Sequence, residues 1–310
     1  MLTVLKTALE VGLIYGLVAL ALFISFSILN IADLSTDGCF TLGCAVGAML
    51  TIAGHPILAL FAAMAAGMLS GYVTAFLQTR LGVESILAGI ISNTGLYTIN
   101  LAVMGFSSNV SITGVDTVFS LFKGLVGGQW SRLILLALIA AVIVLVLIRF
   151  FGTSLGLSIR ATGDSLDMVS ASSINPKATI TIGLCLANAL TALSGCLIGE
   201  YNKFCDINLG TGMVTIALAS LIIGEVFAGR RGSVGKRVVC VVLGSIVYRF
   251  IIALALRLNI SAEYFKLVSA VIVAVAIAAP NMKDYVHLAK IKSNARKLRA
   301  LSGKGDETDA

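Results

Sequence analysis

Residues 11–29, VGLIYGLVALALFISFSIL, form an apolar run without a charge, and residues 30–40, NIADLSTDGCF, follow it as a polar junction. A bilayer core is about 30 Å thick and needs roughly 20 apolar residues as a helix. The run therefore predicts a membrane span over about residues 8–29. It is long for the apolar core of a signal peptide, and no clear small-residue cleavage site follows it, so we expect it to remain in the chain.

The whole chain has the same apolar character. Of its 310 residues, 58% are hydrophobic and 12% are charged, whereas a soluble domain has about 45–50% and about 25%. Backbone polar groups in lipid must be satisfied internally, and the apolar runs lack the period-two alternation of barrel strands. We therefore predict an all-α, polytopic transmembrane helical bundle. About nine spans are expected, over residues 8–29, 35–52, 57–77, 84–104, 132–150, 178–199, 211–228, 238–256 and 264–280.

The distribution of Lys and Arg predicts the orientation. With the C-terminus in the cytoplasm, the inner segments hold 15 of these residues and the outer segments hold 6. Cytoplasmic loops are enriched in Lys and Arg, so we expect the N-terminus outside and the C-terminus inside. The chain is then one membrane domain, residues 1–281, with a basic cytoplasmic tail, residues 282–310. Much of the net charge of +7 lies in this tail, where anionic lipid rather than nucleic acid is the expected partner.

Polar residues at the junction and inside the spans admit two interpretations. Ser35 or Asp37 can cap the helix that follows the junction, and buried asparagines can join helices by hydrogen bonds. In transporters, however, a break in the helix at membrane depth places polar side chains beside the solute pathway. Both interpretations stay open. The pathway candidates are Asp33, Ser35, Asp37, Asn93, Asn100 and Asn188.

Two charged residues and two glycine pairs also stand out within the predicted spans. Glu225 is placed to reach the lipid headgroups, and Arg249 is placed to extend its guanidinium outward. The pairs Gly12-xxx-Gly16 and Gly43-xxx-Gly47 predict close approach of neighbouring helices.

The longest inner loop, residues 151–177, predicts a contact with a soluble partner. Asp164 can cap a short helix over about residues 165–173, which either docks in a groove of that partner or rests on the membrane. The chain has no ATP-binding loop of its own, since the nearest run, Gly232 to Lys236, has the wrong spacing. No hydrolase motif occurs, and the six cysteines are expected to be buried apolar residues. We therefore predict no enzyme activity, no cofactor and no metal.

The same loop resembles a known family. Thr153-x-x-Gly156-x-x-x-Arg160-Ala161-x-Gly163-Asp164, followed by Ser173-Ile174-Asn175, is similar to the cytoplasmic coupling segment of ABC permeases of the branched-chain amino acid and ribose importer family. Residues 12–20 and 31–38 resemble the first block of that family, and order and spacing agree over about residues 8–280. Met168 and Ser173 depart from the usual Ala and Gly. The resemblance is nearest to a branch linked with tryptophan or tyrosine uptake.

This resemblance implies a function, a location and a set of partners. It implies a permease subunit of an ATP-driven importer in a bacterial-type inner cell membrane, moving a small polar solute such as an amino acid. The partners would be P-loop ATPase subunits, an extracytoplasmic solute-binding protein and a second permease copy, identical or homologous. Within the coupling segment, about residues 152–177, it assigns ATPase coupling to Arg160, Ala161, Gly163, Asp164, Ser165, Leu166, Asp167, Val169, Ser173 and Ile174.

Two other functions remain possible from the residues alone. The polar junction and the intramembrane asparagines also suit an ion-coupled secondary transporter or a channel for a small solute, although such carriers usually show an acid at mid-membrane. The small-residue pairs suit a membrane scaffold without transport.

Overall fold

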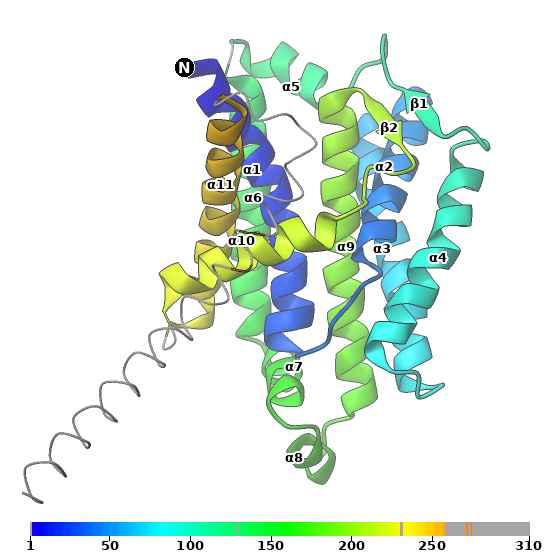
Figure 1. Ribbon diagram of the computed structural model, residues 1–310, viewed down its shortest axis with the longest axis vertical. Coiled ribbons are helices and arrows are strands. Elements are labelled where there is room, and N and C mark those ends of the chain that lie inside the picture. Colours follow the sequence, from blue (N-terminus) through cyan, green and yellow to red (C-terminus); the bar gives the residue numbers. More distant parts are fainter. Residues whose placement is uncertain (1, 129, 230–231, 258–270, 272–273, 275–310) are drawn as a thin grey trace, which may run out of the picture.

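The structure, a computed structural model, describes residues 2–128, 130–229, 232–257, 271 and 274. The predicted tail, residues 282–310, lies outside the described residues, and so does the predicted span over residues 264–280 apart from residues 271 and 274. The described part of the chain is mainly helical (Figure 1). Its elements are α1 (Leu2–Leu22), the π-helix η1 (Phe23–Ile28), α2 (Thr36–Ile52), α3 (Pro56–Thr79), α4 (Ser85–Val103), β1 (Asn109–Ser111), α5 (Val118–Val126), α6 (Ser131–Phe151), α7 (Ser154–Asp164), α8 (Leu166–Ala171), α9 (Pro176–Asn202), β2 (Phe204–Asp206), α10 (Met213–Ala228) and α11 (Val234–Arg257).

Six of the described helices are long and apolar enough to cross a membrane. They are Val4–Ile28, Pro56–Thr79, Ser85–Val103, Ser131–Phe151, Pro176–Asn202 and Val234–Ala255. The helices α2 and α10 are also apolar but shorter. The predicted helical bundle is confirmed, whereas the count of about nine spans and the orientation stay predictions.

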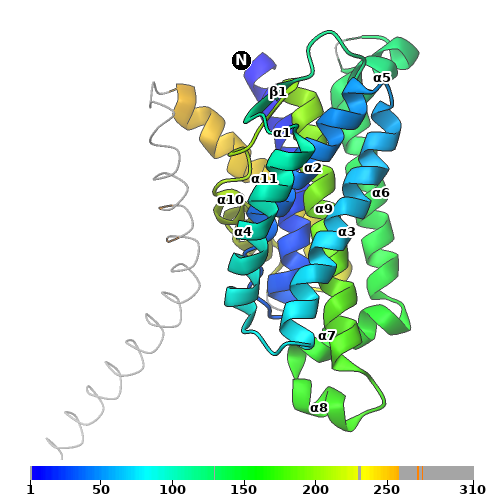
Figure 2. The ribbon, with the colours of Figure 1, turned by 90° about the vertical axis from the view of Figure 1, so that its right-hand side faces the viewer.

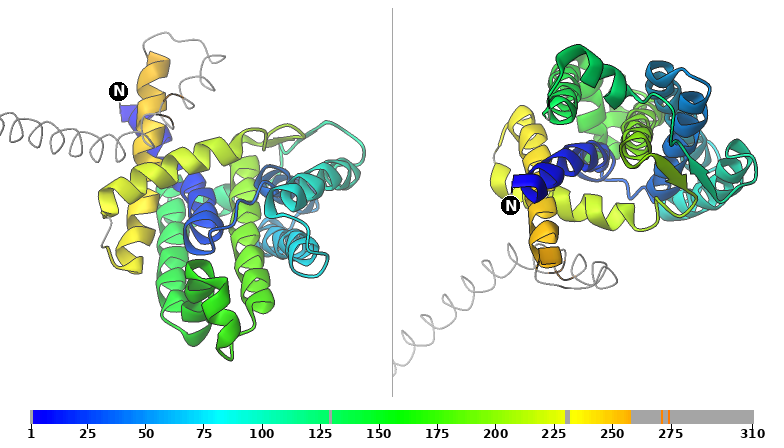
Figure 3. Two further views of the ribbon diagram at one scale, coloured as in Figure 1. Left: turned by 60° about the horizontal axis from the view of Figure 1, so that its bottom comes forward. Right: turned by 90° about the horizontal axis from the view of Figure 1, so that it is seen from above.

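The two short helices begin inside the bundle. After η1 the chain runs back along the bundle before α2 starts (Figure 1). The helix α10 lies across the other helices, and the view from above shows it lengthwise (Figure 3). The helix predicted over residues 211–228 is therefore present as α10, but its direction differs from that of a simple span.

The two ends of the bundle carry different small elements. The N-terminus, α5 and the strand pair lie at one end, called the α5 end here, and α7 and α8 lie at the other, the α8 end (Figure 2). In the strand pair, β1 and β2 are antiparallel, with Val110 opposite Cys205. This pairing joins the segment before α5 to the loop after α9.

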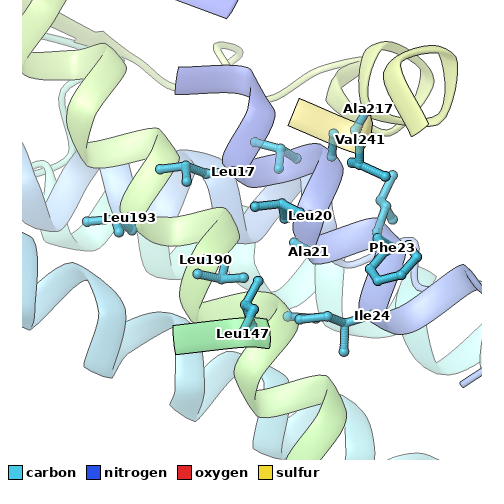
Figure 4. Packing of buried hydrophobic residues seen from close by; sticks show 14 of the residues in the cluster. Leu17, Leu20, Ala21, Phe23, Ile24, Leu147, Leu190, Leu193, Ala217 and Val241 are labelled. Carbon is cyan, nitrogen blue, oxygen red and sulfur yellow. The ribbon is translucent and has the colours of Figure 1, made fainter. Parts of the chain in front are cut away.

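The core forms around α1 and α9, which are the most buried of the spanning helices. Side chains from five helices and η1 meet there (Figure 4). Those labelled are Leu17, Leu20, Ala21, Phe23, Ile24, Leu147, Leu190, Leu193, Ala217 and Val241. The helices α4 and α6 leave most of their surface uncovered, as expected for helices that face lipid.

Both predicted glycine pairs lie at close helix contacts. Gly12 and Gly16 face Ile246 and Val242 of α11, and a Cβ added to Gly12 would lie 3.0 Å from the Cα of Ile246. Gly43 and Gly47 face Ala192 and Cys196 of α9, and a Cβ on Gly43 would overlap the Ala192 carbonyl group. The prediction of close approach is confirmed, and it is tightest at Gly43, where a side chain would overlap the backbone of the neighbouring helix.

A pair of matched substitutions tests the contact between α2 and α9. Gly43→Ala should cost about 1–3 kcal/mol, because the new methyl group meets backbone that cannot move aside. Gly95→Ala in α4 is the control, since nothing lies within 4 Å of its added Cβ. The apparent melting temperature in detergent should fall by several degrees for Gly43→Ala and should not fall for Gly95→Ala. Equal melting temperatures for the two variants would contradict the packing described.

Candidate functional site

The junction before α2 is fixed to the middle of α9 by Asp33. Its Oδ1 accepts hydrogen bonds from the backbone N–H and the hydroxyl of Ser35, at 2.8 and 2.6 Å. Its Oδ2 accepts one from the Asn188 amide, at 2.9 Å. Asp33 is 3% exposed and Asn188 is 1% exposed, so this contact lies in the interior of the bundle. The polar junction is therefore buried against a spanning helix.

Ser35 occupies the predicted N-cap position of α2, but its side chain makes no capping hydrogen bond. Its backbone is helical, with φ −73° and ψ −10°, whereas a capping residue is usually extended, and its hydroxyl donates to Asp33. Asp37 lies in the first turn of α2 but points to another helix. The predicted start of α2 at Ser35 is confirmed, whereas the prediction that Asp37 caps α2 is wrong, because its carboxylate binds a helix distant in sequence.

Asp37 caps α10 instead. Its two carboxylate oxygens accept hydrogen bonds from the backbone N–H groups of Gly212 and Val214, each at 2.9 Å. The first N–H groups of a helix have no partner within the helix, and their positive end favours a carboxylate. In the preceding turn, the Gly210 N–H donates to the Thr41 hydroxyl at 3.1 Å. The starts of α2 and α10 thus meet in the bundle.

The two asparagines of α4 lie beside the same turn. The Asn100 amide donates to the Gly38 carbonyl oxygen at 3.0 Å. A Cβ added to Gly38 would lie 2.6 Å from the Asn93 side-chain oxygen. Together with the contacts above, the structure brings all six pathway candidates around the junction and the first turn of α2. The side chains of Asp37, Asn100 and Asn188 make hydrogen bonds to segments distant in sequence. The side-chain oxygens of Asn100 and Asn188 are buried without a partner among the described residues.

An apolar cleft lies between α2, α3 and α4. Its volume is about 540 Å³, and Leu42, Leu69, Val73 and Ile99 are among its lining residues. The cleft is not lined by any of the six pathway candidates. It is therefore a poor passage for a polar solute, and the polar surface near the junction lies elsewhere.

The coupling segment forms two helices at the α8 end. Thr153 caps α7 by accepting from the Gly156 N–H at 3.3 Å, and Ser165 caps α8 by accepting from the Met168 N–H at 3.3 Å. The prediction that Asp164 caps the short helix is wrong, because Asp164 is the last residue of α7. Ser165 has the extended backbone of a capping residue, with φ −160° and ψ 112°.

The residues assigned to coupling differ in exposure. Leu166 is 53% exposed and Met168 is 64% exposed, while Val169 is buried and fixes α8 to the bundle. Of the remaining residues, Asp164, Asp167 and Ser173 are exposed, and Arg160, Ala161, Gly163, Ser165 and Ile174 are partly buried. The tip of the segment therefore presents apolar and acidic side chains together.

The base of this segment rests on η1. A Cβ added to Gly163 would overlap the Ile28 carbonyl oxygen, and the hydroxyls of Thr162 and Thr179 are 2.8 Å apart. A Cβ on Gly183 would lie 2.5 Å from Leu29, so α9 packs on the same turn. The π-helix η1 leads directly into the junction, and π-helices often occur at functional sites. A packed path thus runs from α7 through η1 to Asp33.

An ion pair at η1 was not predicted from the sequence. Arg237 of α11 pairs with Glu225 of α10 at 2.6 Å, and both side chains also bind the Ser27 hydroxyl. The Arg237 guanidinium lies 5.1 Å from the centre of the Phe23 ring. Glu225 therefore binds protein groups where headgroups were expected. The sequence offers one signal for this ion pair: the acid and the base are twelve residues apart, on either side of a Gly-containing turn.

Glu200, a buried acid of α9, was not singled out from the sequence. Glu200 accepts hydrogen bonds from the Thr51 hydroxyl at 3.1 Å and from the Val118 N–H at 2.8 Å. Glu200, which belongs to α9, thus provides a hydrogen-bond acceptor for the first N–H group of α5. Glu200 lies just beyond the predicted end of its span at residue 199, where a charged residue is common and gives no signal of burial.

Comparison with known proteins gives a family match and two relatives. Residues 4–277 match the family described as "Branched-chain amino acid transport system / permease component". The chain is 31% identical over 294 residues to a tyrosine transport system permease protein of Clostridioides difficile (strain R20291), covering 94% of this chain and 95% of that protein. It is also 31% identical over 284 residues to an uncharacterised protein of Rickettsia prowazekii (strain Madrid E), covering 91% and 99%. No solved structure matches.

Removal of the Asp37 carboxylate tests the cap of α10. Asp37→Ala should destabilise the fold by about 0.5–2 kcal/mol and should speed hydrogen exchange in peptides that contain the Gly212 and Val214 amides. Asp167→Ala, at an exposed aspartate of α8, is the control and should leave that exchange unchanged. Protection of these amides that survives Asp37→Ala would exclude the cap.

Proposed function

Because the chain belongs to the family of branched-chain amino acid transport system permease components, we propose that it is the membrane-spanning subunit of an ATP-driven ABC importer. A permease component is a transport subunit rather than an enzyme, so ATP hydrolysis falls to P-loop ATPase partners. The observation that supports this proposal most is the position of the α7–α8 segment. It extends beyond the bundle and packs on η1, which leads into the polar junction.

The proposed solute is an amino acid, with tyrosine as the first one to test. The support is the relative in Clostridioides difficile, which is described as a tyrosine transport permease and aligns over nearly the whole of both chains. The family description names branched-chain amino acids, so leucine is the natural comparison solute. Both are zwitterions that need a polar pathway through the bundle.

The tip of α8 is the proposed docking point for the ATPase. Leu166 and Met168 are exposed beside Asp164 and Asp167, and α8 lies beyond the ends of the spanning helices (Figure 2). Apolar side chains of a short helix can fill a groove, and the acids can pair with basic residues at its rim. The buried Val169 keeps α8 attached to the bundle, so a force on the tip reaches α7.

In the proposed mechanism, the motion of the ATPase reaches the polar junction through the close contact at Gly163. When the ATPase moves α8, α7 pushes on the Ile28 carbonyl group through Gly163, and η1 then moves the junction. Asp33 and Asp37 tie this junction to α9 and α10, so a shift there changes how the two helix starts meet. Packed elements of this kind transmit small displacements because they cannot deform freely. In this mechanism, the six polar residues around the junction border the gate for the solute.

The remaining partners follow from the proposed orientation. The α8 end faces the cytoplasm and the ATPase, and the α5 end faces an extracytoplasmic solute-binding protein. A second permease copy, identical or homologous, completes the pathway. The location is then the bacterial-type inner cell membrane.

One observation favours a second function, ion-coupled transport. Such carriers use acids at membrane depth, and Asp33 lies buried within the bundle. Asp33 and Asp37 nevertheless accept hydrogen bonds that hold the junction and the start of α10. These structural contacts leave the acids less free to exchange ions, so the ATP-driven mechanism is the better proposal.

Reconstitution in proteoliposomes separates the two functions. The chain, purified with its co-purifying partners, should take up tyrosine only when ATP is present and the binding protein is added. Uptake should continue after ionophores collapse the ion gradients. Uptake that needs a gradient and ignores ATP would replace the importer by a secondary transporter.

Substitution at the tip of α8 tests the docking point. Leu166→Asp should reduce recovery of the ATPase with the tagged permease at least about tenfold, because a charge replaces an apolar contact. Leu121→Asp, at an exposed leucine of α5 at the opposite end, should leave recovery unchanged. Recovery that is equal for both variants would remove α8 from the interface.

Substitution at the base of α7 tests the transmission. Gly163→Ala should lower ATP-driven uptake at least about tenfold while the ATPase still binds, because the added methyl group displaces η1 from α7. Gly152→Ala is the control, since its added Cβ meets its nearest neighbour at an ordinary 3.4 Å. If Gly163→Ala transports normally, the path through Ile28 is not used.

A further inference from the structure

Arg249 is a charged residue inside a spanning helix, and it has no acid partner among the described residues. It lies in α11, and its Nε atom is buried with no hydrogen-bond acceptor in the described part of the chain. The ion pairs of the described residues join Lys6 to Glu10 and Arg237 to Glu225, so neither includes Arg249. Burying an unpaired charge in a membrane is costly, and such residues usually have a functional partner.

The structure corrects the expectation that Arg249 extends outward to the headgroups. Its guanidinium carbon lies 3.8 Å from the centre of the Tyr15 ring of α1, which is a stacked cation–π contact. One turn earlier, the Ser245 hydroxyl donates to the Gly12 carbonyl oxygen at 2.7 Å and fixes α11 to α1. The guanidinium is thereby held inside the bundle.

The contact with Tyr15 lies on a face of the guanidinium, and the described residues supply no hydrogen-bond acceptor at its Nε edge. The N–H donors of arginine lie in the plane of the group, so a ring on its face does not satisfy them. Arg249 is partly exposed, although its Nε is buried. The group is thus oriented, charged and short of acceptors, which is the state in which arginine binds a carboxylate through two parallel hydrogen bonds.

Arg249 also lies near the polar junction. The Tyr15 ring that it contacts lies 6.1 Å from the Phe40 ring, measured between ring centres. Phe40 is in the second turn of α2, next to the residues that meet α4, α9 and α10. Two aromatic rings therefore separate the guanidinium from the proposed gate.

We propose that Arg249 binds the carboxylate group of the amino acid on its way to the junction. This inference rests on the proposed import of an amino acid and adds the residue that recognises one part of it. The paired N–H groups of the Arg249 guanidinium replace the hydrogen bonds that the carboxylate made to water, and the Tyr15 ring keeps the guanidinium in position. A solute without a carboxylate would have no such partner in this part of the bundle.

Chemical modification tests the site in the unmodified chain. Phenylglyoxal reacts with arginine side chains, and mass spectrometry of the purified complex in neutral-lipid nanodiscs gives the extent of reaction at Arg249. L-tyrosine should slow this reaction at least about threefold, whereas tyramine, which lacks the carboxylate, should not. Equal protection by both compounds, or protection by neither, would overturn the proposal.

The same assay tests whether Arg249 binds an amino acid carboxylate or the phosphate of a lipid headgroup. Nanodiscs with anionic phosphatidylglycerol, without amino acid, should leave the reaction at Arg249 as fast as in neutral lipid. Protection by the anionic lipid equal to that by tyrosine would assign Arg249 to a headgroup phosphate and would overturn the amino acid site. This assay does not depend on transport. Failure of the proposed function would appear as absent ATP-driven uptake by the unmodified complex, whereas failure of this site would appear as absent protection of Arg249.

Variants test the effect on transport. Arg249→Met keeps the apolar volume and removes the charge, and it should lower ATP-driven tyrosine uptake at least about tenfold with ATPase activity and melting temperature unchanged. Arg249→Lys keeps the charge but loses the paired N–H donors of the guanidinium. Its tyrosine uptake should lie between that of Arg249→Met and that of the unmodified chain. Tyr15→Phe keeps the ring face and should transport normally. Normal uptake by Arg249→Met, or equal losses in Arg249→Met and Arg249→Lys together with a lower melting temperature, would show that Arg249 only holds α11.

Discussion

A helix that begins inside a lipid-embedded bundle must find partners for its first N–H groups, because no water is present to bind them. This constraint governs the centre of the molecule. The Asp37 carboxylate satisfies the start of α10, and Asp33 satisfies the turn that leads into α2 while binding Asn188. The orientation of two short helices, and the meeting of α2, α9 and α10, depend on these two carboxylates.

The same centre is reached from the α8 end mainly through close packing, with one hydroxyl contact between Thr162 and Thr179. Gly163 allows α7 to pack directly on the backbone of Ile28 and Leu29, and Gly183 gives the Leu29 side chain room against α9. Backbone packed on backbone leaves no flexible side chain to absorb a displacement. The ion pair of Arg237 and Glu225 holds the opposite side of η1 through Ser27. The π-helix is thus enclosed between a coupling segment and a charged contact, and both bear on the junction.

The sequence predicted the helices well and their contacts unevenly. Hydropathy located eight of the described helices because burial in lipid demands long apolar runs, and the glycine pairs located the contacts of α1 and α2. The capping roles of Asp37 and Asp164 were predicted wrongly, because a capping rule considers neighbours in sequence. Asp37 binds the start of a helix distant in sequence, and Asp164 is the last residue of the preceding helix. The direction of α10 and the partner of Arg249 depend on tertiary packing, which no local pattern encodes.

The distance along the chain between the partners at the junction has a consequence for biosynthesis. Asp33 and Asn188 are 155 residues apart, and Asp37 and the α10 start are at least 175 apart. During translation, the polar junction therefore enters the translocon long before its partners exist. The short helix α2 must wait in an unfinished state, shielded by the insertion machinery or by chaperones, until α9 and α10 arrive. The long apolar helices of the first half can enter the membrane by themselves, so synthesis of the second half is the step that completes the hydrogen bonds of the junction.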